Sequence, residues 1–223
     1  MDRMTDSLPA GARDRRVLLA GATSGAGLAA TRALVEAGAT VIATGRSRDR
    51  LDPLAEAGAL VEVADATARD DMSALAARLG AVDAVVPLVG GWRGGGGLAG
   101  QSDDDFHALL PALEAVRATS RAFDAALRAS PAGRFAIVSS TAVARPLAGG
   151  ANYAAVKAAS EAWTRAVAQG FAKAAREAEQ PLRAAAVVLR AKALDPAALA
   201  ARLVRLWDDD ASTLNDSILD LDG

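Results

Sequence analysis

The sequence lacks several residue types on which whole classes of function depend. It contains no cysteine, which excludes disulfides, thiolate metal sites and cysteine nucleophiles. It contains one histidine, His107, so a histidine-based triad or a multi-histidine metal site is hard to build. We expect His107 to lie on a helix surface, and we expect no metal site.

Long apolar runs and an excess of one charge are also missing. No run is long and apolar enough to span a membrane, and residues 1–6 lack the apolar core of a signal peptide. We therefore expect a cytoplasmic protein with no membrane partner. The net charge of −2 and the pI near 5.5 give no broad basic surface, which argues against nucleic acid as a partner.

The composition supplies enough apolar material for one core. Hydrophobic residues make up 52% of the 223 residues, and the mean hydropathy is +0.17, which suits a single α/β domain. Residues 1–14 are polar and are punctuated by proline and glycine. We assign residues 1–14 to a flexible N-terminal tail and residues 15–223 to the domain.

Short apolar runs alternate with helical patterns along the domain. Periodicity predicts strands at residues 16–20, 40–44, 59–63, 84–89, 134–138, 184–189 and 217–221. It predicts helices at residues 28–37, 48–57, 69–79, 103–129, 152–178 and 196–208, with a kink or later start at Pro111. This alternation indicates a doubly wound, Rossmann-type parallel sheet flanked by helices, which binds ligands beyond the carboxyl ends of its strands.

A glycine-rich turn follows the first predicted strand. Glycines 21, 25 and 27 let the backbone turn tightly and approach a ligand, and the next helix directs free amides at it. Such a turn favours binding of a dinucleotide pyrophosphate, although glycine turns also simply cap helices. The candidate cofactor-binding residues are Gly21, Thr23, Ser24, Gly25, Ala26, Gly27, Arg46, Asp65, Ala66, Gly90, Tyr153 and Lys157.

The residue after the second predicted strand bears on the choice of cofactor. Many dinucleotide enzymes carry an acidic residue there, which binds the ribose hydroxyls and repels a 2′-phosphate. This chain carries Arg46, whose guanidinium can pair with that phosphate, and this favours NADP over NAD. The alternative is that Arg46 faces solvent as one of several arginines in residues 46–50.

The candidate catalytic residues lie between Ser140 and Lys157. Tyr153 and Lys157 are four residues apart, so they share a helix face, and a nearby cation lowers the pKa of a phenol. Ser140 precedes Tyr153 by 13 residues, which is enough for a strand end, a loop and a helix start. We expect the three side chains to converge, although a Tyr-x-x-x-Lys pair alone also arises by chance in an alanine-rich helix.

Together these residues resemble the short-chain dehydrogenase/reductase family over residues 16–223. The resemblance rests on Gly21-x-x-x-Gly25-x-Gly27, Asp65, Ser140, Tyr153-x-x-x-Lys157 and the closing residues 218–223. It implies an oxidoreductase that uses a nicotinamide cofactor, for which Arg46 favours NADP, and acts on a small molecule. In it Tyr153 would transfer the proton, Lys157 would hold the nicotinamide ribose and Ser140 would hydrogen-bond the substrate carbonyl. It also implies that Asp65 meets the adenine ring, and that the two long helices pair in a homodimer or homotetramer.

Three departures from the family pattern modify this expectation. Residues 87–90 read Pro-Leu-Val-Gly where members carry Asn-Asn-Ala-Gly. The helix asparagine that serves a proton relay in the family aligns with Leu113. Leu189-Arg190 replaces a Pro-Gly pair, and a helix follows almost at once, so the long substrate lid is missing. We expect a pocket that is open or is closed by another segment.

Residues 89–95, Val-Gly-Gly-Trp-Arg-Gly-Gly, resemble a glycine-tryptophan loop in dihydropteridine reductases. Trp92 would stack there on a flat substrate, or else would plug the loop. Those enzymes typically have alanine in place of Ser140 and an acidic residue in place of Arg46. We therefore expect hydride transfer to or from a carbonyl, alcohol or related C=N group. Pterin reduction, nucleotide binding without efficient catalysis and redox-neutral chemistry are the alternatives.

Overall fold

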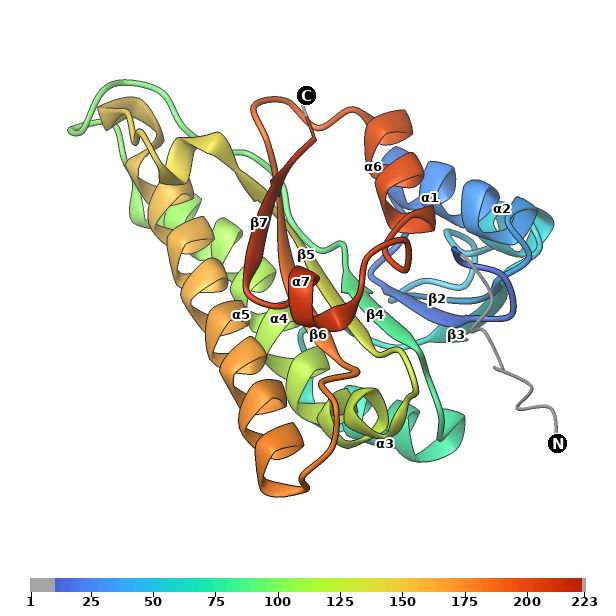
Figure 1. The fold of residues 1–223 in the computed structure, drawn as a ribbon. Helices are drawn as coiled ribbons and strands as arrows, with labels where there is room; N and C mark the ends of the chain where they lie inside the picture. Colours follow the sequence, from blue (N-terminus) through green and yellow to red (C-terminus); the bar gives the residue numbers. More distant parts are fainter. Residues whose placement is uncertain (1–10, 222–223) are drawn as a thin grey trace, which may run out of the picture.

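A parallel sheet of seven strands runs through the centre of the computed structural model, which describes residues 11–221 (Figure 1). The strand order is β3-β2-β1-β4-β5-β6-β7, and every pair of neighbours is parallel. The strands are β1 (Arg16–Ala20), β2 (Thr40–Gly45), β3 (Leu60–Val63), β4 (Ala84–Pro87), β5 (Arg134–Ser140), β6 (Ala185–Ala191) and β7 (Ser217–Asp220).

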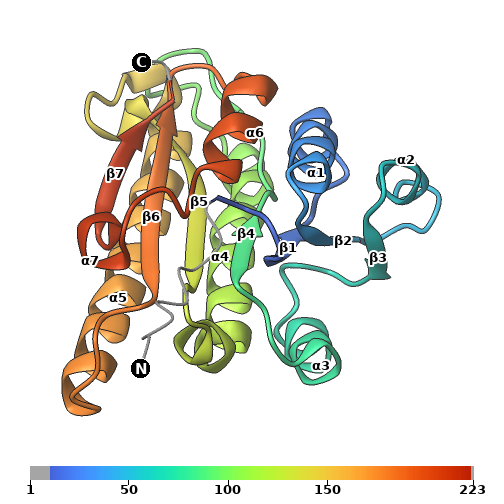
Figure 2. The same cartoon turned by 45° about the vertical axis from the view of Figure 1, so that its right-hand side comes forward.

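Helices cover both faces of this sheet (Figure 2). One layer contains α1 (Gly25–Glu36), α2 (Asp52–Glu56) and α6 (Pro196–Val204), and the short α7 (Ala211–Leu214) packs on the same side. The other layer contains α3 (Arg69–Leu79), α4 (Asp103–Ala129) and α5 (Ala151–Glu177). Within residues 11–221, no helix combines the length and the apolar character needed to cross a membrane.

Alternate residues of the central strands supply the two halves of the core. Val17 and Leu19 of β1 pack toward the α1 and α6 layer, whereas Leu18 and Ala20 pack toward the α3, α4 and α5 layer. Each of the four is at most 1% exposed. Because helices cover both faces, these strands read as continuous apolar runs and not as an alternation of apolar and polar residues.

The predicted fold class is confirmed, and most of the predicted elements lie within a few residues of the observed ones. Pro111 neither delays α4 nor ends it, because the helix begins at Asp103 and continues to Ala129. The Ser102 hydroxyl accepts a hydrogen bond from the Asp105 amide, and three aspartates complement the helix dipole in the first turn. The helix predicted at residues 196–208 ends earlier, at Val204, and the sequence pattern missed α7.

The predicted N-terminal tail is wrong at its last residues. Residues 11–14 form a turn against the domain, in which Ala12 is only 1% exposed. The Asp14 amide donates a hydrogen bond to the Gly38 carbonyl at 3.0 Å. The segment is mostly polar, so its composition gave no indication that Ala12 belongs to the core. Residues 1–10, the rest of the predicted tail, lie outside the described residues.

The turn between β1 and α1 depends on its glycines for different reasons. Gly21 adopts a φ of +76°, a region that favours glycine. At Gly27, a Cβ would collide with the main chain of Ala22, so the glycine permits close packing of the turn on the helix. The Ser24 hydroxyl accepts a hydrogen bond from the Gly27 amide at 3.2 Å and caps α1.

We expect Gly27→Ala to lower the free energy of unfolding by about 1–3 kcal/mol, because the added methyl group must displace the Ala22 main chain. Gly25→Ala is the matched control, since a Cβ at Gly25 meets no atom within 4 Å. Urea unfolding of both variants without cofactor measures the difference. Equal stability of the two variants would contradict the role assigned to Gly27.

Candidate active site

Two adjoining cavities lie at the carboxyl ends of the central strands. The larger has a volume of about 1050 Å³ and the smaller about 550 Å³. Both are lined by Ser24 after β1 and by residues 88–91 after β4. The order of the sheet places β1 and β4 side by side, so the segments that follow them meet between the two cavities.

The smaller cavity collects most of the predicted nucleotide-binding residues. Those that line it are Gly21, Thr23, Ser24, Arg46, Asp65, Ala66 and Gly90. Buried Thr44 at the end of β2 supports the turn between β1 and α1, because its hydroxyl accepts a hydrogen bond from the Gly21 amide at 3.1 Å. Asp65 Oδ1 accepts hydrogen bonds from the amide and the hydroxyl of Thr67, which fix the carboxylate at the cavity wall.

The other five predicted cofactor-binding residues do not line the smaller cavity, and two of them, Tyr153 and Lys157, line the larger one. Ala26 also lines the larger cavity. Gly25 and Gly27 line neither cavity, because both belong to the first turn of α1. A Cβ at Gly27 would collide with the Ala22 main chain, so Gly27 has a packing role, whereas a Cβ at Gly25 would meet no atom within 4 Å.

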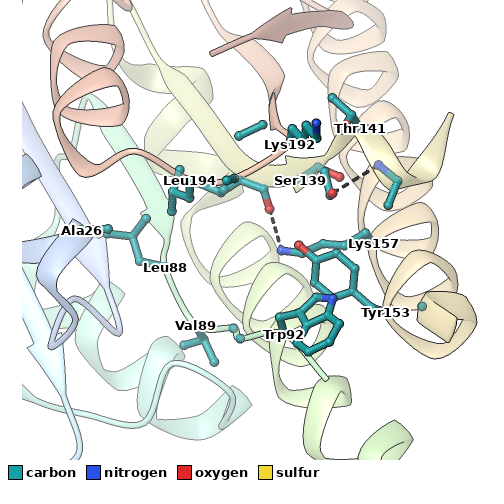
Figure 3. A pocket seen from close by; sticks show the side chains of 18 of the residues that line it. Ala26, Leu88, Val89, Trp92, Ser139, Thr141, Tyr153, Lys157, Lys192 and Leu194 are labelled. Atoms are coloured by element: carbon teal, nitrogen blue, oxygen red, sulfur yellow. Dashed lines mark hydrogen bonds between the residues drawn. The ribbon is translucent and has the colours of Figure 1, made fainter. Parts of the chain in front are cut away.

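The larger cavity brings Ser140, Tyr153 and Lys157 together, as predicted. Ser140 is the last residue of β5, and its hydroxyl accepts a hydrogen bond from the Ala142 amide at 3.2 Å. Tyr153 and Lys157 lie on successive turns at the start of α5. Figure 3 shows Tyr153 and Lys157 grouped with Trp92 at one side of this cavity.

Lys157 is almost fully enclosed. Its side chain is directed at β5, where Nζ donates a hydrogen bond to the Val138 carbonyl at 2.8 Å (Figure 3). Nζ also lies 5.7 Å from the centroid of the Tyr153 ring. Burial lowers the pKa of Lys157 to about 8, and the nearby Glu161 carboxylate opposes this change. The ammonium is thus charged at neutral pH and loses its proton at mildly alkaline pH.

The environment of Tyr153 reverses one expectation. Burial raises the pKa of Tyr153, and a hydrogen bond with the Ser140 side chain only partly opposes this. The phenol packs against an apolar cluster that includes Leu109, Val156 and Leu113, the residue in place of the family asparagine. The predicted lowering of the Tyr153 pKa is therefore wrong in direction, because desolvation by these neighbours outweighs the stabilisation of the phenolate.

The glycine-rich loop of residues 90–100 supplies one wall of the larger cavity. Gln101 fastens this loop to the turn before α5. Its Nε2 donates to the Gly95 and Gly149 carbonyls at 3.0 and 3.1 Å, and its Oε1 accepts from the Asn152 amide at 3.1 Å. Trp92 of the loop lines the cavity and is 61% exposed. The sequence offered no signal for Gln101, because its partners are main-chain groups, and those of Gly149 and Asn152 are about 50 residues away.

The sequence analysis also did not identify the ion pair between Glu161 and Arg190, which lies one helical turn beyond Lys157. Glu161 is 5% exposed and pairs with Arg190 of β6 at 2.6 Å. Glu161 lies four residues after Lys157 and so shares its helix face, which is a signal that could have been noticed. Its partner could not, because the contact depends on how β6 lies beside β5 and under α5.

The comparisons with known proteins agree with this geometry. A family model described as short chain dehydrogenase matches residues 15–175, so the chain belongs to the short-chain dehydrogenase family. No curated protein sequence matches the chain.

Many solved structures share the fold. A gluconate 5-dehydrogenase from Burkholderia cenocepacia J2315, solved with NADP and tartrate, is 21% identical with a TM-score of 0.76, covering 93% of each chain. An oxidoreductase from E. coli, yciK, is 19% identical with a TM-score of 0.80, covering 95% of this chain and 96% of its own. A short-chain type dehydrogenase/reductase from Mycobacterium ulcerans is 18% identical with a TM-score of 0.78, covering 93% and 88%.

We expect the Tyr153 pKa to lie above the ordinary value of about 10 and to rise further in Ser140→Ala, which removes a hydrogen bond that favours the phenolate. Tyr153 is the only tyrosine of the chain, so the near-ultraviolet absorbance of phenolate during an alkaline titration reports this residue alone. Far-UV circular dichroism must confirm that the protein stays folded over the titration. A lower pKa in Ser140→Ala would refute the proposed hydrogen bond.

Proposed function

We propose that the protein is an NADP(H)-dependent oxidoreductase that transfers a hydride between the nicotinamide and a carbonyl, alcohol or related C=N substrate. The observation that carries this proposal is the convergence of Ser140, Tyr153 and Lys157 on one cavity that adjoins a second, nucleotide-sized one. Membership in the short-chain dehydrogenase family supports the same class of reaction.

The smaller cavity fits the adenosine half of such a cofactor. The N-terminus of α1 borders it, and open space next to Gly25 leaves room for a pyrophosphate at that helix end. Arg46, Ser47 and Arg50 line the side after β2, where the side chains can pair with a 2′-phosphate. The similar gluconate 5-dehydrogenase was solved with NADP, which supports the same preference here.

The side chains of the larger cavity would handle the proton and the substrate oxygen. The cofactor, when bound, supplies or accepts the hydride. Ser140 would hydrogen-bond the carbonyl oxygen, and Tyr153 would donate its proton to that oxygen as charge develops on it. Lys157 would exchange its bond with the Val138 carbonyl for one with the nicotinamide ribose, and would keep a positive charge beside the phenol.

Trp92 favours a second candidate, the reduction of a pterin-like ring. Its indole lines the cavity close to Tyr153, where a flat substrate could stack on it (Figure 3). Ser140 and Arg46 stand against this candidate, because dihydropteridine reductases typically carry alanine and an acidic residue at the corresponding positions. Turnover of a quinonoid dihydropterin faster than of simple carbonyls would favour it.

We further propose a homodimer or homotetramer that pairs α4 and α5 with their copies. The outer face of α5 carries small exposed side chains that would permit close helix approach: Ala155, Ala158, Ala159, Ala162 and Ala166. Sedimentation equilibrium of the wild type and of Ala159→Glu tests this pairing. A monomeric wild type, or an unchanged mass in the variant, would argue against it.

We expect Tyr153→Phe to lower kcat by about 10²–10⁴-fold on the best substrate of a carbonyl panel, because the variant lacks the proton that balances hydride transfer. NADPH consumption measures the rate, and NADPH titration followed by tryptophan fluorescence serves as the binding control. Near wild-type turnover in Tyr153→Phe would contradict the role of Tyr153. NADPH binding by the wild type without turnover on any panel member would favour a non-catalytic or redox-neutral role.

We expect Arg46→Ala to raise the KM for NADPH by about 10–100-fold and to leave that for NADH nearly unchanged, because a charge-assisted hydrogen bond contributes about 1.5–3 kcal/mol. Arg48→Ala is the matched control, since Arg48 is an exposed neighbour that does not line the smaller cavity. The ratio of kcat/KM for the two cofactors gives the preference. The same ratio in wild type and Arg46→Ala would exclude Arg46 from phosphate recognition.

A further inference from the structure

We propose that Glu161 and Arg190 form a buried charge pair that positions Lys157 and controls whether its ammonium stays protonated. Both are positioning residues, because neither lines the larger cavity and both act through Lys157. The inference rests on the proposed function, in which the Lys157 ammonium acts beside Tyr153.

The Glu161 carboxylate is held on both oxygens. Oε1 accepts a hydrogen bond from the Ser139 hydroxyl at 2.6 Å and another from Arg190 Nε at 2.9 Å. Oε2 accepts from Arg190 Nη2 at 2.6 Å. Arg190 lies opposite Ser139 in the register of β6 with β5, so the guanidinium reaches the carboxylate in a bidentate geometry. Glu161 is one helical turn beyond Lys157 and therefore shares its face of α5.

Three consecutive residues at the end of β5 each bind a different side chain of α5. The Val138 carbonyl accepts from Lys157, the Ser139 hydroxyl donates to Glu161, and the Ser140 side chain hydrogen-bonds Tyr153. The contact between Ser140 and Tyr153 is thus one of three neighbouring hydrogen bonds that join β5 to α5. A shift of the Glu161 contact would displace α5 relative to the strand and would change the other two.

A purely structural role does not explain why charged residues occupy this position. Desolvation makes a buried ion pair costly, and apolar residues of the same volume often stabilise a fold as well or better. Glu161 and Arg190 are mostly buried, with side-chain exposures of 7% and 18%. The charge of Glu161 does act on Lys157, however, because the field of a nearby carboxylate favours the ammonium form.

The balance of charge around Lys157 gives the two residues opposite effects. Burial holds the pKa of Lys157 at about 8, and the Glu161 carboxylate opposes a further fall. Because the Arg190 guanidinium binds both oxygens of that carboxylate, we expect it to offset part of the carboxylate's field at Lys157. The other titratable groups facing this region are Tyr153 on the same helix, Arg145 after β5 and Lys192 after β6, while Asp220 of β7 acts on Arg190.

The test follows the protonation of Lys157 directly in the intact protein. The chain contains only three lysines, Lys157, Lys173 and Lys192, so labelling with ¹³Cε-lysine gives few NMR signals, and Lys157→Arg assigns the relevant one. We expect Glu161→Gln to raise the acid dissociation constant of Lys157 about tenfold, because Arg190 is then uncompensated. We expect Arg190→Gln to lower it by a similar factor, because the carboxylate is then uncompensated. The double variant should titrate close to wild type.

Circular dichroism and urea unfolding establish that each variant is folded, and Arg190→Lys, which keeps the charge, replaces Arg190→Gln if the latter unfolds. Arg190→Lys should titrate close to wild type. Unchanged Lys157 titration in Glu161→Gln, or a shift in the same direction in the Glu161 and Arg190 glutamine variants, would overturn the proposal. A merely structural pair would change stability without these opposite shifts.

Turnover separates this inference from the proposed function. With an active substrate, the alkaline limb of the pH profile of kcat/KM should move with the Lys157 titration, to lower pH in Glu161→Gln and to higher pH in Arg190→Gln. Opposite NMR shifts without turnover on any substrate would refute the proposed function and retain the charge pair. Turnover with an unmoved Lys157 titration would retain the function and refute the charge pair.

Discussion

The candidate site depends on how the carboxyl end of β5 is fastened to the first turns of α5. Ser140 and Tyr153 come from different elements, so they stay within reach only while strand and helix keep their register. Lys157 and Glu161 hold that register through Val138 and Ser139, and the adjacent β6 adds Arg190 from beneath. Polar contacts fix this junction, and their directionality gives it a single arrangement.

The departures from the family pattern are physically connected. Leu113 removes a polar group from the helix opposite Tyr153 and leaves an apolar cluster around the phenol. That cluster raises the pKa of Tyr153 and burial lowers the pKa of Lys157, so desolvation opposes the charged form of both residues. Arg190, which stands where members carry a glycine, supplies the partner that allows Glu161 to be buried next to Lys157. The two departures therefore act on neighbouring residues of the site, Leu113 on the phenol of Tyr153 and Arg190, through Glu161, on the ammonium of Lys157.

Local patterns in the sequence were sufficient to predict the sheet and the positions of most candidate residues. Strands buried on both faces give continuous apolar runs, which made the strands recognisable. Parallel strands bring their carboxyl ends to one edge of the sheet, so Ser140 and Arg46, which follow strands, were predicted to lie at that edge, where the cavities are. Contacts between distant segments could not be predicted in this way. Gln101 binds main-chain groups that have no sequence signature, and the direction of the Tyr153 pKa depends on packing around the ring. The burial of Ala12 could not be predicted for a similar reason, because a single buried methyl group leaves no periodic pattern in the sequence.

The missing lid changes how water must be excluded from the site. Three large apolar side chains line the larger cavity and remain exposed: Trp92, Leu147 and Leu194, at 61%, 71% and 40%. A substrate that covers them gains about 25 cal/mol for each Å² of apolar surface removed from water. Binding would then supply the dry environment in which the polar contacts of Ser140 and Tyr153 become strong. In this arrangement the glycine-rich loop fastened by Gln101 is one wall of the cavity, and a bound substrate would take the place of a mobile cover.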